Sequence, residues 1–590
     1  MTPTTYRKRT HTCGDLRTEH IGKTVTLAGW VDVRRDLGGV IFVDLRDRYG
    51  KTQVVFAPQH HEQTYESAKG LRSEYVIVVS GTVVKRPEGT LNKDLPTGEI
   101  DLDVTELVIL NKAETPPFQI VDEIDVNEDL RLKYRYLDLR RPRMQRNLIM
   151  RHRAYQVTRS YFDRNGFIEV ETPVLMKSTP EGARDYLVPS RLHRGRFYAL
   201  PQSPQTYKQI LMVAGYDKYF QIVKCFRDED NRADRQPEFT QIDVEISFVD
   251  EDDVMRMTEG LITDLFKQTA GVTVQPPFLR LTYKEAMERF GSDKPDLRFG
   301  IEIRDCSAAV TKSGFRVFSE MVAKGGIVAG ICLPNLSTYT RNQLDGLTDF
   351  AKSLGAGGLV YLKMQPDKIE CSVEKFVKEA ETQSIAAALG AKVGDLVLII
   401  SGPWQKALTI LGALRLEMAE RLSLIPKKAW GFLWVTDFPL LEYSEEEKRY
   451  VSVHHPFTSP KPEDLGLLDS EPQKVRARAY DLVLNGTEIG GGSIRIHDSA
   501  LQGKMFGLLG ISPESAKRKF GFMLDAFKYG APPHGGIAFG FDRMLMIMAG
   551  EQSIRDVIAF PKTASAVSLM DDSPSDVEEK QLKELHIRIQ

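Results

Sequence analysis

The chain has 590 residues, of which 42% are hydrophobic and 27% charged, as in ordinary water-soluble globular proteins. At about 150 residues per domain, this length predicts three or four domains. Because 79 Lys and Arg stand against 81 Asp and Glu, the net charge of −2 excludes a polycation that would coat nucleic acid without selectivity.

Cysteine usage and hydropathy exclude further classes. The 5 cysteines are far apart with no C-x-x-C pair, which argues against a disulfide framework and against a zinc ribbon. No apolar run approaches the roughly 18 residues of a membrane span, and the first twenty residues lack the apolar stretch of a signal peptide. We therefore expect a cytoplasmic protein with no membrane partner and no DNA partner.

The first predicted domain, residues 1–112, is a small β-barrel. Five short segments rich in Val, Ile, Leu and Phe fill Thr24 to Leu110, separated by turns that contain glycine. Five strands in about 90 residues are typical of an OB-fold, and an SH3-like barrel is the alternative. The polar stretch 113–130, which contains Pro116-Pro117, predicts a linker.

A helical pattern with a strong positive charge runs from near Asn127 to Asn165, with an interruption at Pro142. Between Arg131 and Arg164, 11 Lys and Arg accompany 2 Asp, a local net charge of +9. Such a run fits a helix whose cations pair with acidic neighbours, and it equally fits a helix that faces RNA or another subunit. The sequence leaves both interpretations open.

The rest of the chain alternates strands and helices, which predicts an α+β multidomain protein. We expect one domain in two parts, residues 131–280 and 425–590, separated by an inserted α+β domain at 281–424. The last part ends in a charged helix or tail after Asp571. The inserted domain shows no cluster of ionisable residues that indicates a site.

Several common sites are absent from the sequence. There is no G-x-x-x-x-G-K-[ST], no H-E-x-x-H, no G-x-S-x-G, and no convincing G-x-G-x-x-G after a first strand. If the protein uses ATP, a P-loop does not hold it.

The segment KCFRDEDNRADRQPEFTQIDVEISF (224–248) predicts a hairpin with a highly charged loop. Arginines in such a loop can bind phosphate oxygens through two hydrogen bonds, although a loop of compensating ion pairs is the alternative. Alternation along the returning strand places Asp243 and Glu245 on one face. Acidic groups there would suit an ammonium group or a metal.

Two glycine-rich segments also carry charged residues. In NGTEIGGGSIRI (485–496), Glu488 precedes three glycines and Arg495 follows them, so the backbone can approach a ligand between the two charges; a bulge or packing contact is the alternative. In GGIAFGFDRMLMIM (535–548), Arg543 stands near the start of a predicted helix. A cation there is unfavourable unless an anion binds, which makes Arg543 a candidate phosphate ligand.

Taken together, these segments resemble a known family. FIEVETPVL, FRDED…RQPEFTQIDVE and GIAFGFDR resemble motifs 1, 2 and 3 of the class II aminoacyl-tRNA synthetases, in the right order. TPEGARDYLVP, LPQSPQTYKQ, VHHPFTSP and EIGGGSIRIH further resemble the bacterial-type aspartyl-tRNA synthetases of subclass b. The resemblance covers residues 15–565, and its seven motifs are ordered along the chain.

This resemblance implies a fold and a reaction. The expected fold is an N-terminal OB-fold that binds the anticodon and an antiparallel catalytic sheet of six or seven strands flanked by helices, in a homodimer formed through motif 1. The expected reaction joins L-aspartate to ATP as aspartyl-adenylate and then transfers aspartate to the 3′ end of tRNA-Asp. No covalent enzyme intermediate is needed, which suits a sequence without an evident nucleophile.

The resemblance also implies the site residues. Arg227 would hold the α-phosphate, Arg543 would stack on adenine opposite Phe239, and these two arginines are the expected catalytic residues. The expected aspartate site consists of Glu181, Ser203, Gln205, Lys208, Arg227, Asp243, His454, His455 and Arg495. The expected ATP site consists of Arg227, Asp228, Glu229, Gln236, Phe239, Glu488, Gly540, Phe541, Asp542 and Arg543. Asp481 and Glu488 would hold Mg²⁺, and the cations Lys208 and Arg495 would reject asparagine, whose neutral amide leaves buried charge unpaired.

In the barrel, the resemblance implies that Phe42 stacks on an anticodon base, with Arg35 and Gln53 on the anticodon loop. The resemblance gives two conflicting indications of the tRNA range. Leu37 looks like the residue of enzymes that charge only tRNA-Asp, whereas Gly89 looks like the residue of relaxed enzymes that also charge tRNA-Asn. We expect relaxed or intermediate tRNA specificity. An asparaginyl- or lysyl-type synthetase and a non-catalytic RNA-binding paralogue are the alternatives.

Overall fold

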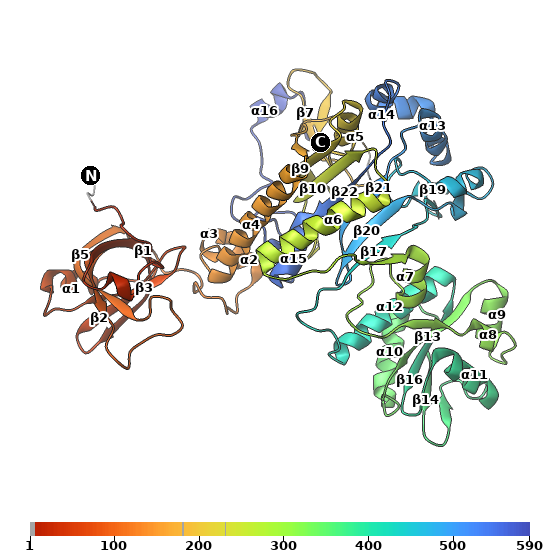
Figure 1. Cartoon of the computed structure of the whole chain (residues 1–590), viewed down its shortest axis with the longest axis horizontal. Helices are drawn as coiled ribbons and strands as arrows, with labels where there is room; N and C mark the ends of the chain where they lie inside the picture. The colour runs from red at the N-terminus through yellow and green to blue at the C-terminus, as the bar shows by residue number, and fades with distance from the viewer. Residues whose placement is uncertain (1–5, 180–181, 231) are drawn as a thin grey trace. The chain divides into compact units, whose positions relative to one another are not determined.

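The computed structural model describes residues 6–179, 182–230 and 232–590. They form two compact units, each described by itself (Figure 1). The barrel unit contains the described residues up to Ile149 together with Arg555–Ser575, and the sheet unit contains Met150–Ile554 together with Asp576–Gln590. Glu181, an expected site residue, lies outside the described residues.

Five strands of the barrel unit close into a barrel in the order β1-β2-β3-β5-β4. Neighbouring strands are antiparallel except for the parallel pair β3 and β5. A short helix, α1, lies between β3 and β4 in the chain. The bounds are β1 Thr24–Leu37, β2 Val40–Arg46, β3 Lys51–Phe56, α1 Glu62–Ala68, β4 Val76–Lys85 and β5 Ile100–Asn111.

Alternation of side chains fills the barrel and leaves a polar outer face. Along β2 and β3 every second residue is buried, with Ile41, Val43 and Val54 in the barrel core. The residues between them face outward, because successive side chains of a strand point to opposite sides. Phe42 therefore lies on the outer face, half-buried, and does not belong to the core.

The barrel is followed by a helical segment that contains α2 (Glu128–Lys133), α3 (Arg135–Asp138) and α4 (Pro142–Arg164). Asn127 caps α2 by accepting a hydrogen bond from the backbone N–H of Asp129. Eight cations of the segment are ion-paired within the described residues: Arg131, Arg135, Arg140, Arg141, Arg146, Arg151, Arg159 and Arg164. Of the two interpretations of this basic run, the structure favours pairing with acidic neighbours.

The sheet unit is built on a sheet that has eight strands within the described residues, in the order β11-β17-β20-β21-β22-β10-β9-β6. The expectation of six or seven strands was too low, because the short edge strands β6 and β11 each add a parallel pair to an antiparallel centre. The bounds are β6 Ile168–Glu169, β9 Lys218–Phe226, β10 Glu238–Ser247, β11 Leu279–Thr282, β17 Phe432–Thr436, β20 Ala479–Leu484, β21 Thr487–Ile494 and β22 His534–Gly540.

Helices and small hairpins surround this sheet, with α5, α6 and α15 packed against its central strands β10 and β22. A capping box at Asp250 begins α6. The helix bounds are α5 Gln205–Val213, α6 Glu251–Leu265, α13 Ser499–Leu508, α14 Pro513–Phe527, α15 Phe541–Ala549 and α16 Glu579–Glu584. The hairpins are β7 Leu187–Pro189 with β8 Phe197–Ala199, and β18 Leu441–Ser444 with β19 Arg449–Ser452.

Between β11 and β17 the chain forms a separate antiparallel sheet, β12-β13-β16-β14-β15, with hydrophobic clusters that extend to helices on both faces. Helix α7 begins at a capping box on Thr282 and ends at Gly291, whose φ of 68° is the left-handed conformation that glycine adopts easily. The bounds are α7 Tyr283–Phe290, β12 Ile303–Asp305, α8 Ser307–Val310, α9 Arg316–Ala323, β13 Ile327–Leu333, α10 Arg341–Ser353, β14 Val360–Met364, β15 Ile369–Cys371, α11 Glu379–Leu389, β16 Leu396–Gly402 and α12 Trp404–Arg421. The exact domain boundaries stay predictions.

Among the described helices, none combines the length and the apolar character that crossing a membrane requires.

Candidate active site

A cavity of about 440 Å³ opens over the centre of the large sheet. Its floor consists of β10, β20, β21 and β22, and its walls come from α5, α15, the loop before β10 and the loop after β19. Sixteen expected site residues line it: Ser203, Gln205, Lys208, Arg227, Glu229, Gln236, Phe239, Asp243, His454, His455, Asp481, Glu488, Arg495, Gly540, Asp542 and Arg543.

Two expected residues do not line the cavity. Phe541 is fully buried and stacks on Tyr155, with 4.7 Å between ring centroids. Asp228 lies at the edge of the loop, where its backbone N–H donates to the carbonyl of Arg184. Phe541 thus supports the helix that carries Asp542 and Arg543 and does not contact the cavity itself.

Four charged residues form a buried cluster at the floor. Lys208 Nζ lies 3.0 Å from Asp243 Oδ1 and 3.4 Å from Glu245 Oε2, and Arg495 Nε donates to Glu245 Oε1 over 3.0 Å. Each of the four side chains is at most 6% exposed. Two cations and two anions balance, so the cluster is neutral before any ligand enters.

The pKa values of the two carboxylates of this cluster are shifted in opposite directions. Burial raises the pKa of Asp243, although Lys208 acts against the rise. Burial also opposes the charge of Glu245, but Arg495 and Lys208 hold its pKa below the ordinary value. Glu245 therefore stays ionised and fixes Arg495. The glycine at position 536 leaves the space that this carboxylate needs, because a Cβ there would lie 2.1 Å from Glu245 Oε2.

Two adjacent histidines on the loop after β19 have pKa values that are shifted in opposite directions. Burial, together with the nearby cations Arg495 and Lys208, lowers the pKa of His455 to about 3, so its imidazole is neutral. Burial also disfavours charge on His454, but the carboxylate of Asp481, 3.4 Å from its Nε2, raises its pKa. His455 can therefore act as a neutral hydrogen-bond donor beside the cationic pair.

Asp481 and Glu488 form a carboxylate pair with the properties of a cation site. The neighbouring charge of Asp481, together with burial, raises the pKa of Glu488 to about 7. A Cβ on Gly491 would lie 2.9 Å from Asp481 Oδ1 and 3.2 Å from Glu488 Oε1, so glycine keeps the space between them open. Within the described residues, no group of three or more His, Cys, Asp or Glu could hold a metal. Two carboxylates fit Mg²⁺ only if phosphate oxygens and water complete its coordination.

Two arginines and an aromatic ring form the other side of the cavity. The guanidinium of Arg227 lies over the ring of Phe239, 5.0 Å from its centroid. Arg543 donates to the carbonyl of Glu488 over 2.9 Å and to Asp234 Oδ2 over 3.1 Å. A flat ring beside guanidinium groups suits a nucleobase and phosphates.

Six buried polar atoms of residues that line the cavity have no hydrogen-bond partner among the described residues. They are Gln205 Nε2, Asp243 Oδ2, His454 Nδ1, His455 Nε2, Asp481 Oδ1 and Arg543 Nε. Buried polar groups in folded proteins are nearly always hydrogen-bonded, so a cluster of unpaired ones indicates a ligand that completes them. Both donors and acceptors are present, which predicts a ligand with both kinds of group.

Sequence reasoning did not assign several residues that the structure places in the cavity. Ser493 accepts a hydrogen bond from Arg495 over 2.7 Å and lies 3.2 Å from the hydroxyl of Thr458. Asp234 and Ile554 also line the cavity. The alternation of β21, which places Ser493 and Arg495 on one face, could have identified Ser493. No pattern in the sequence indicates that Ile554 lines the cavity.

The outer face of the barrel carries the residues expected to contact the anticodon. Arg35 donates to Asp44 over 2.7 Å and to Gln53 over 3.2 Å, and it pairs with Phe42 across β1 and β2. Leu37 is 62% exposed at the end of β1. Gly89, with a φ of 88°, lies in the connection between β4 and β5. An outward aromatic ring beside polar side chains is a platform on which single-stranded bases can stack.

Two family descriptions match the chain. "tRNA synthetases class II (D, K and N)" matches residues 127–564, and "OB-fold nucleic acid binding domain" matches residues 25–110. The chain is 58% identical to the Aspartate–tRNA(Asp/Asn) ligase of Caldanaerobacter subterraneus subsp. tengcongensis over 99% of this chain and 98% of the relative. It is also 58% identical to the protein of the same name from Moorella thermoacetica, over 98% of this chain and 96% of that one.

Solved structures show the same fold at low identity. The asparaginyl-tRNA synthetase of Pyrococcus horikoshii, complexed with asparaginyl-adenylate, matches with a TM-score of 0.59 and 20% identity over 94% of this chain and 98% of that chain. The aspartyl tRNA synthetase of Entamoeba histolytica matches with a TM-score of 0.57 and 19% identity over 94% of this chain and 91% of that one.

Proposed function

The chain belongs to the class II tRNA synthetases of the D, K and N group, and from this membership we propose that it is an aspartate–tRNA ligase that uses ATP. The observation that carries the proposal is the set of six unpaired buried polar atoms around the neutral cluster of Lys208, Asp243, Glu245 and Arg495. L-Aspartate offers both acceptors and donors to this set, and the nearby arginines suit the phosphates of ATP.

Two of the charged groups of aspartate, its side-chain carboxylate and its ammonium group, would bind at the buried cluster. Its side-chain carboxylate lies against Lys208 and Arg495, with the neutral imidazole of His455 as a further donor. Its ammonium group lies against Asp243, whose Oδ2 accepts no hydrogen bond from the described residues. Asparagine has the same shape but a neutral amide, so it would leave the buried cations without the added anion. The site therefore favours aspartate over asparagine.

Activation requires only positioning and charge stabilisation by the protein. The α-carboxylate of aspartate attacks the α-phosphorus of ATP, the bond to the β-phosphate oxygen breaks, and pyrophosphate leaves with that electron pair. Arg227 would hold the α-phosphate, where negative charge accumulates in the transition state. Arg543 would lie over the adenine, opposite Phe239. The 3′ hydroxyl of the tRNA then attacks the activated carbonyl and releases AMP.

Magnesium would bind at Asp481 and Glu488. The space that Gly491 leaves open and the raised pKa of Glu488 both fit a missing cation between the two carboxylates. When bound, Mg²⁺ would offset the negative charge of the phosphates. This chain would hold the ion with these two carboxylates, and phosphate oxygens and water would complete its coordination.

The oligomeric state that we propose is a homodimer. Large apolar side chains before and within the hairpin of β7 and β8 are between 48% and 76% exposed: Ile168, Val174, Leu175, Leu187, Leu192 and Phe197. Apolar groups gathered in this way along one segment indicate a protein interface. Sedimentation equilibrium should therefore give twice the chain mass of 66.6 kDa, and a single-chain mass would contradict the dimer. We also propose a cytoplasmic location, because translation consumes the aspartyl-tRNA that the enzyme makes.

Two alternative functions fit the cavity less well. An asparaginyl- or lysyl-type synthetase shares the barrel and the sheet, but two cations facing the substrate side chain do not suit a neutral amide or an amine. A non-catalytic RNA-binding protein would have no use for the eight expected ATP residues that line the cavity. The aspartate ligase is the function that the geometry supports best.

The test is aspartylation of tRNA-Asp and tRNA-Asn transcripts side by side, with labelled aspartate, ATP and Mg²⁺. We expect both to be charged, because the relatives bear the name Aspartate–tRNA(Asp/Asn) ligase and Gly89 has the relaxed form. Charging of tRNA-Asp alone would indicate that Leu37, and not Gly89, determines the tRNA specificity. Charging of neither, with no ATP–pyrophosphate exchange, would contradict the ligase.

A further inference from the structure

An ionic network runs along one side of the barrel and centres on Glu74. The carboxylate of Glu74 accepts two hydrogen bonds from Arg46, over 2.6 and 2.8 Å, and Arg46 also binds Asp32 over 2.7 Å. Glu74 is 3% exposed and adopts a φ of 64°, a left-handed conformation that is uncommon for a residue with a side chain. Such conformations persist where the surroundings hold them, so the position of this carboxylate is well determined.

Arg140, which lies between α3 and α4, reaches this network from outside the barrel. Its Nη1 lies 2.6 Å from Glu74 Oε2, and its guanidinium lies over the ring of Trp30 on β1, 5.0 Å from the ring centroid. The Arg140 side chain is 28% exposed, so it is accessible at the edge of the contact. One side chain thus makes both an ion pair and a cation–π contact with the barrel.

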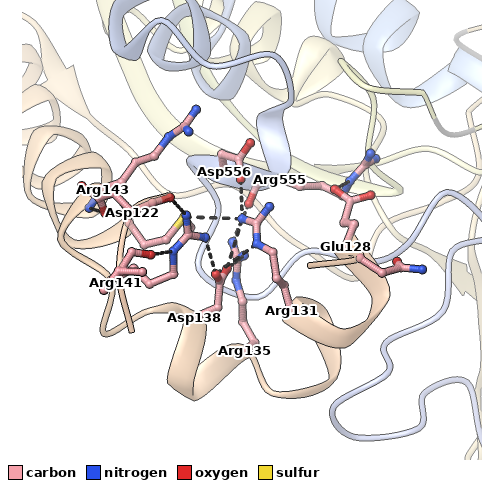
Figure 2. Close-up of polar contacts among 12 residues, drawn as sticks. Asp122, Glu128, Arg131, Arg135, Asp138, Arg141, Arg143, Arg555 and Asp556 are labelled. Atoms are coloured by element: carbon pink, nitrogen blue, oxygen red, sulfur yellow. Dashed lines mark hydrogen bonds and ion pairs between the residues drawn. The ribbon is translucent and has the colours of Figure 1, made fainter. Parts of the chain in front are cut away.

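The segment that carries Arg140 is itself held by a cluster of arginines around Asp138. Figure 2 shows Arg131, Arg135 and Arg141 converging on this carboxylate, over distances of 3.0, 2.6 and 2.7 Å. Asp138 is 0% exposed. Because one carboxylate cannot neutralise three guanidinium groups, the arginines also need other acceptors.

Those acceptors lie in two segments that are remote in the sequence. Arg131 binds Asp556 over 2.9 Å, and Arg135 donates to the carbonyls of Ile558 and Ala559 over 2.8 and 2.9 Å. Arg141 donates to the carbonyls of residues 121 and 122. The cluster therefore fixes the linker and the segment 555–559 to α2 and α3.

Helix α4 and the fixed segment 555–559 both continue into the sheet unit. Helix α4 continues from Ile149 to Met150, and the segment 555–559 follows Ile554. Ile554 lines the cavity, and its backbone N–H donates to the carbonyl of Ala233 in the loop before β10. Arg140 consequently joins the barrel to the helical segment from which the chain continues into the sheet unit.

We propose that Arg140 is a positioning residue that attaches the barrel to the helical segment 128–141, and that charging of an intact tRNA, which has to contact both the barrel and the cavity, depends on this attachment. The inference rests on the proposed function. A ligand with two attachment points binds the second at an effective concentration that depends on how firmly the two sites are held. Without Arg140 the barrel keeps its own network, because Arg46 still pairs with Glu74, but the barrel loses this attachment to the helical segment.

The experiment compares three readouts in the full-length protein and in Arg140→Ala. ATP–pyrophosphate exchange without RNA should be unchanged, and so should the affinity for a hairpin RNA that carries only the anticodon arm. The kcat/KM for aspartylation of intact tRNA-Asp should fall about tenfold, since only this reaction requires both sites together. Arg140→Lys, which can keep the ion pair but lacks the planar group, should recover part of the loss.

Lys133→Ala is the matched control. Lys133 is an exposed cation of the same segment and lies 6.0 Å from the ring of Tyr134. An equal loss in this variant would assign the effect to net charge and overturn the proposal. Loss of exchange or of hairpin affinity in Arg140→Ala would overturn it as well, as would unchanged charging of intact tRNA. Absence of exchange in the wild-type protein would instead contradict the proposed function.

Discussion

Replacing Arg227 with alanine should lower ATP–pyrophosphate exchange about 10²- to 10³-fold while tRNA affinity stays within about twofold. Arg227 lines the cavity and lies 5.0 Å from the ring centroid of Phe239. A guanidinium group at that place can bind two phosphate oxygens and stabilise charge that develops in the transition state. Alanine removes both contributions, and water in the cavity replaces them poorly.

The control for this variant is Arg256→Ala. Arg256 is 75% exposed on α6 and pairs only with Asp253 in the described structure, so its removal should leave exchange unchanged. A native melting profile for Arg227→Ala would show that the loss is not caused by unfolding. Exchange at the wild-type rate in that variant would contradict the placement of the α-phosphate at Arg227, and with it the arrangement proposed for ATP.

Most of the site residues were expected from the resemblance to the synthetase family, and strand alternation alone indicated two residues at the cavity floor. Alternation along β10 places Asp243 and Glu245 on one face, and both belong to the buried cluster. Prediction was weaker where a strand ends and a helix begins. Phe541, the first residue of α15, points toward Tyr155, because the helix register and not the strand alternation determines its direction.

The partners of the basic segment could not be predicted for a different reason. Three of its cations pair with Asp138 inside the segment. Other ion pairs of the segment reach acidic groups far away along the chain: Asp556 lies 425 residues from Arg131, and Glu74 lies 66 residues from Arg140. A local charge count detects the excess of arginine but contains no information about which remote carboxylate will compensate it. The barrel, in contrast, depends on alternation within short strands, which is a local property.

Replacing Asp138 with asparagine should weaken the barrel unit by about 3–5 kcal/mol, because a buried charge cluster that loses its only central anion keeps three cations without adequate compensation. Burial alone would raise the pKa of Asp138, but hydrogen bonds from Arg131 and Arg141 hold it below the ordinary value. A carboxyl group whose pKa is lower in the folded state stabilises the fold above its unfolded pKa of about 4. This contribution is lost as the pH falls through the folded pKa.

The difference between the wild-type protein and Asp138→Asn should therefore be full near neutral pH and shrink below about pH 4. Hydrogen exchange of the backbone amides in 128–141 and 555–559, read by mass spectrometry, measures this local stability directly. The control is Asp525→Asn, an exposed carboxylate paired with Lys528 on α14, which should leave the exchange of both segments unchanged. Protection in these segments that is equal in the wild type and in Asp138→Asn at neutral pH would show that the carbonyl acceptors alone hold the arginines, and that Asp138 is not the centre of the cluster.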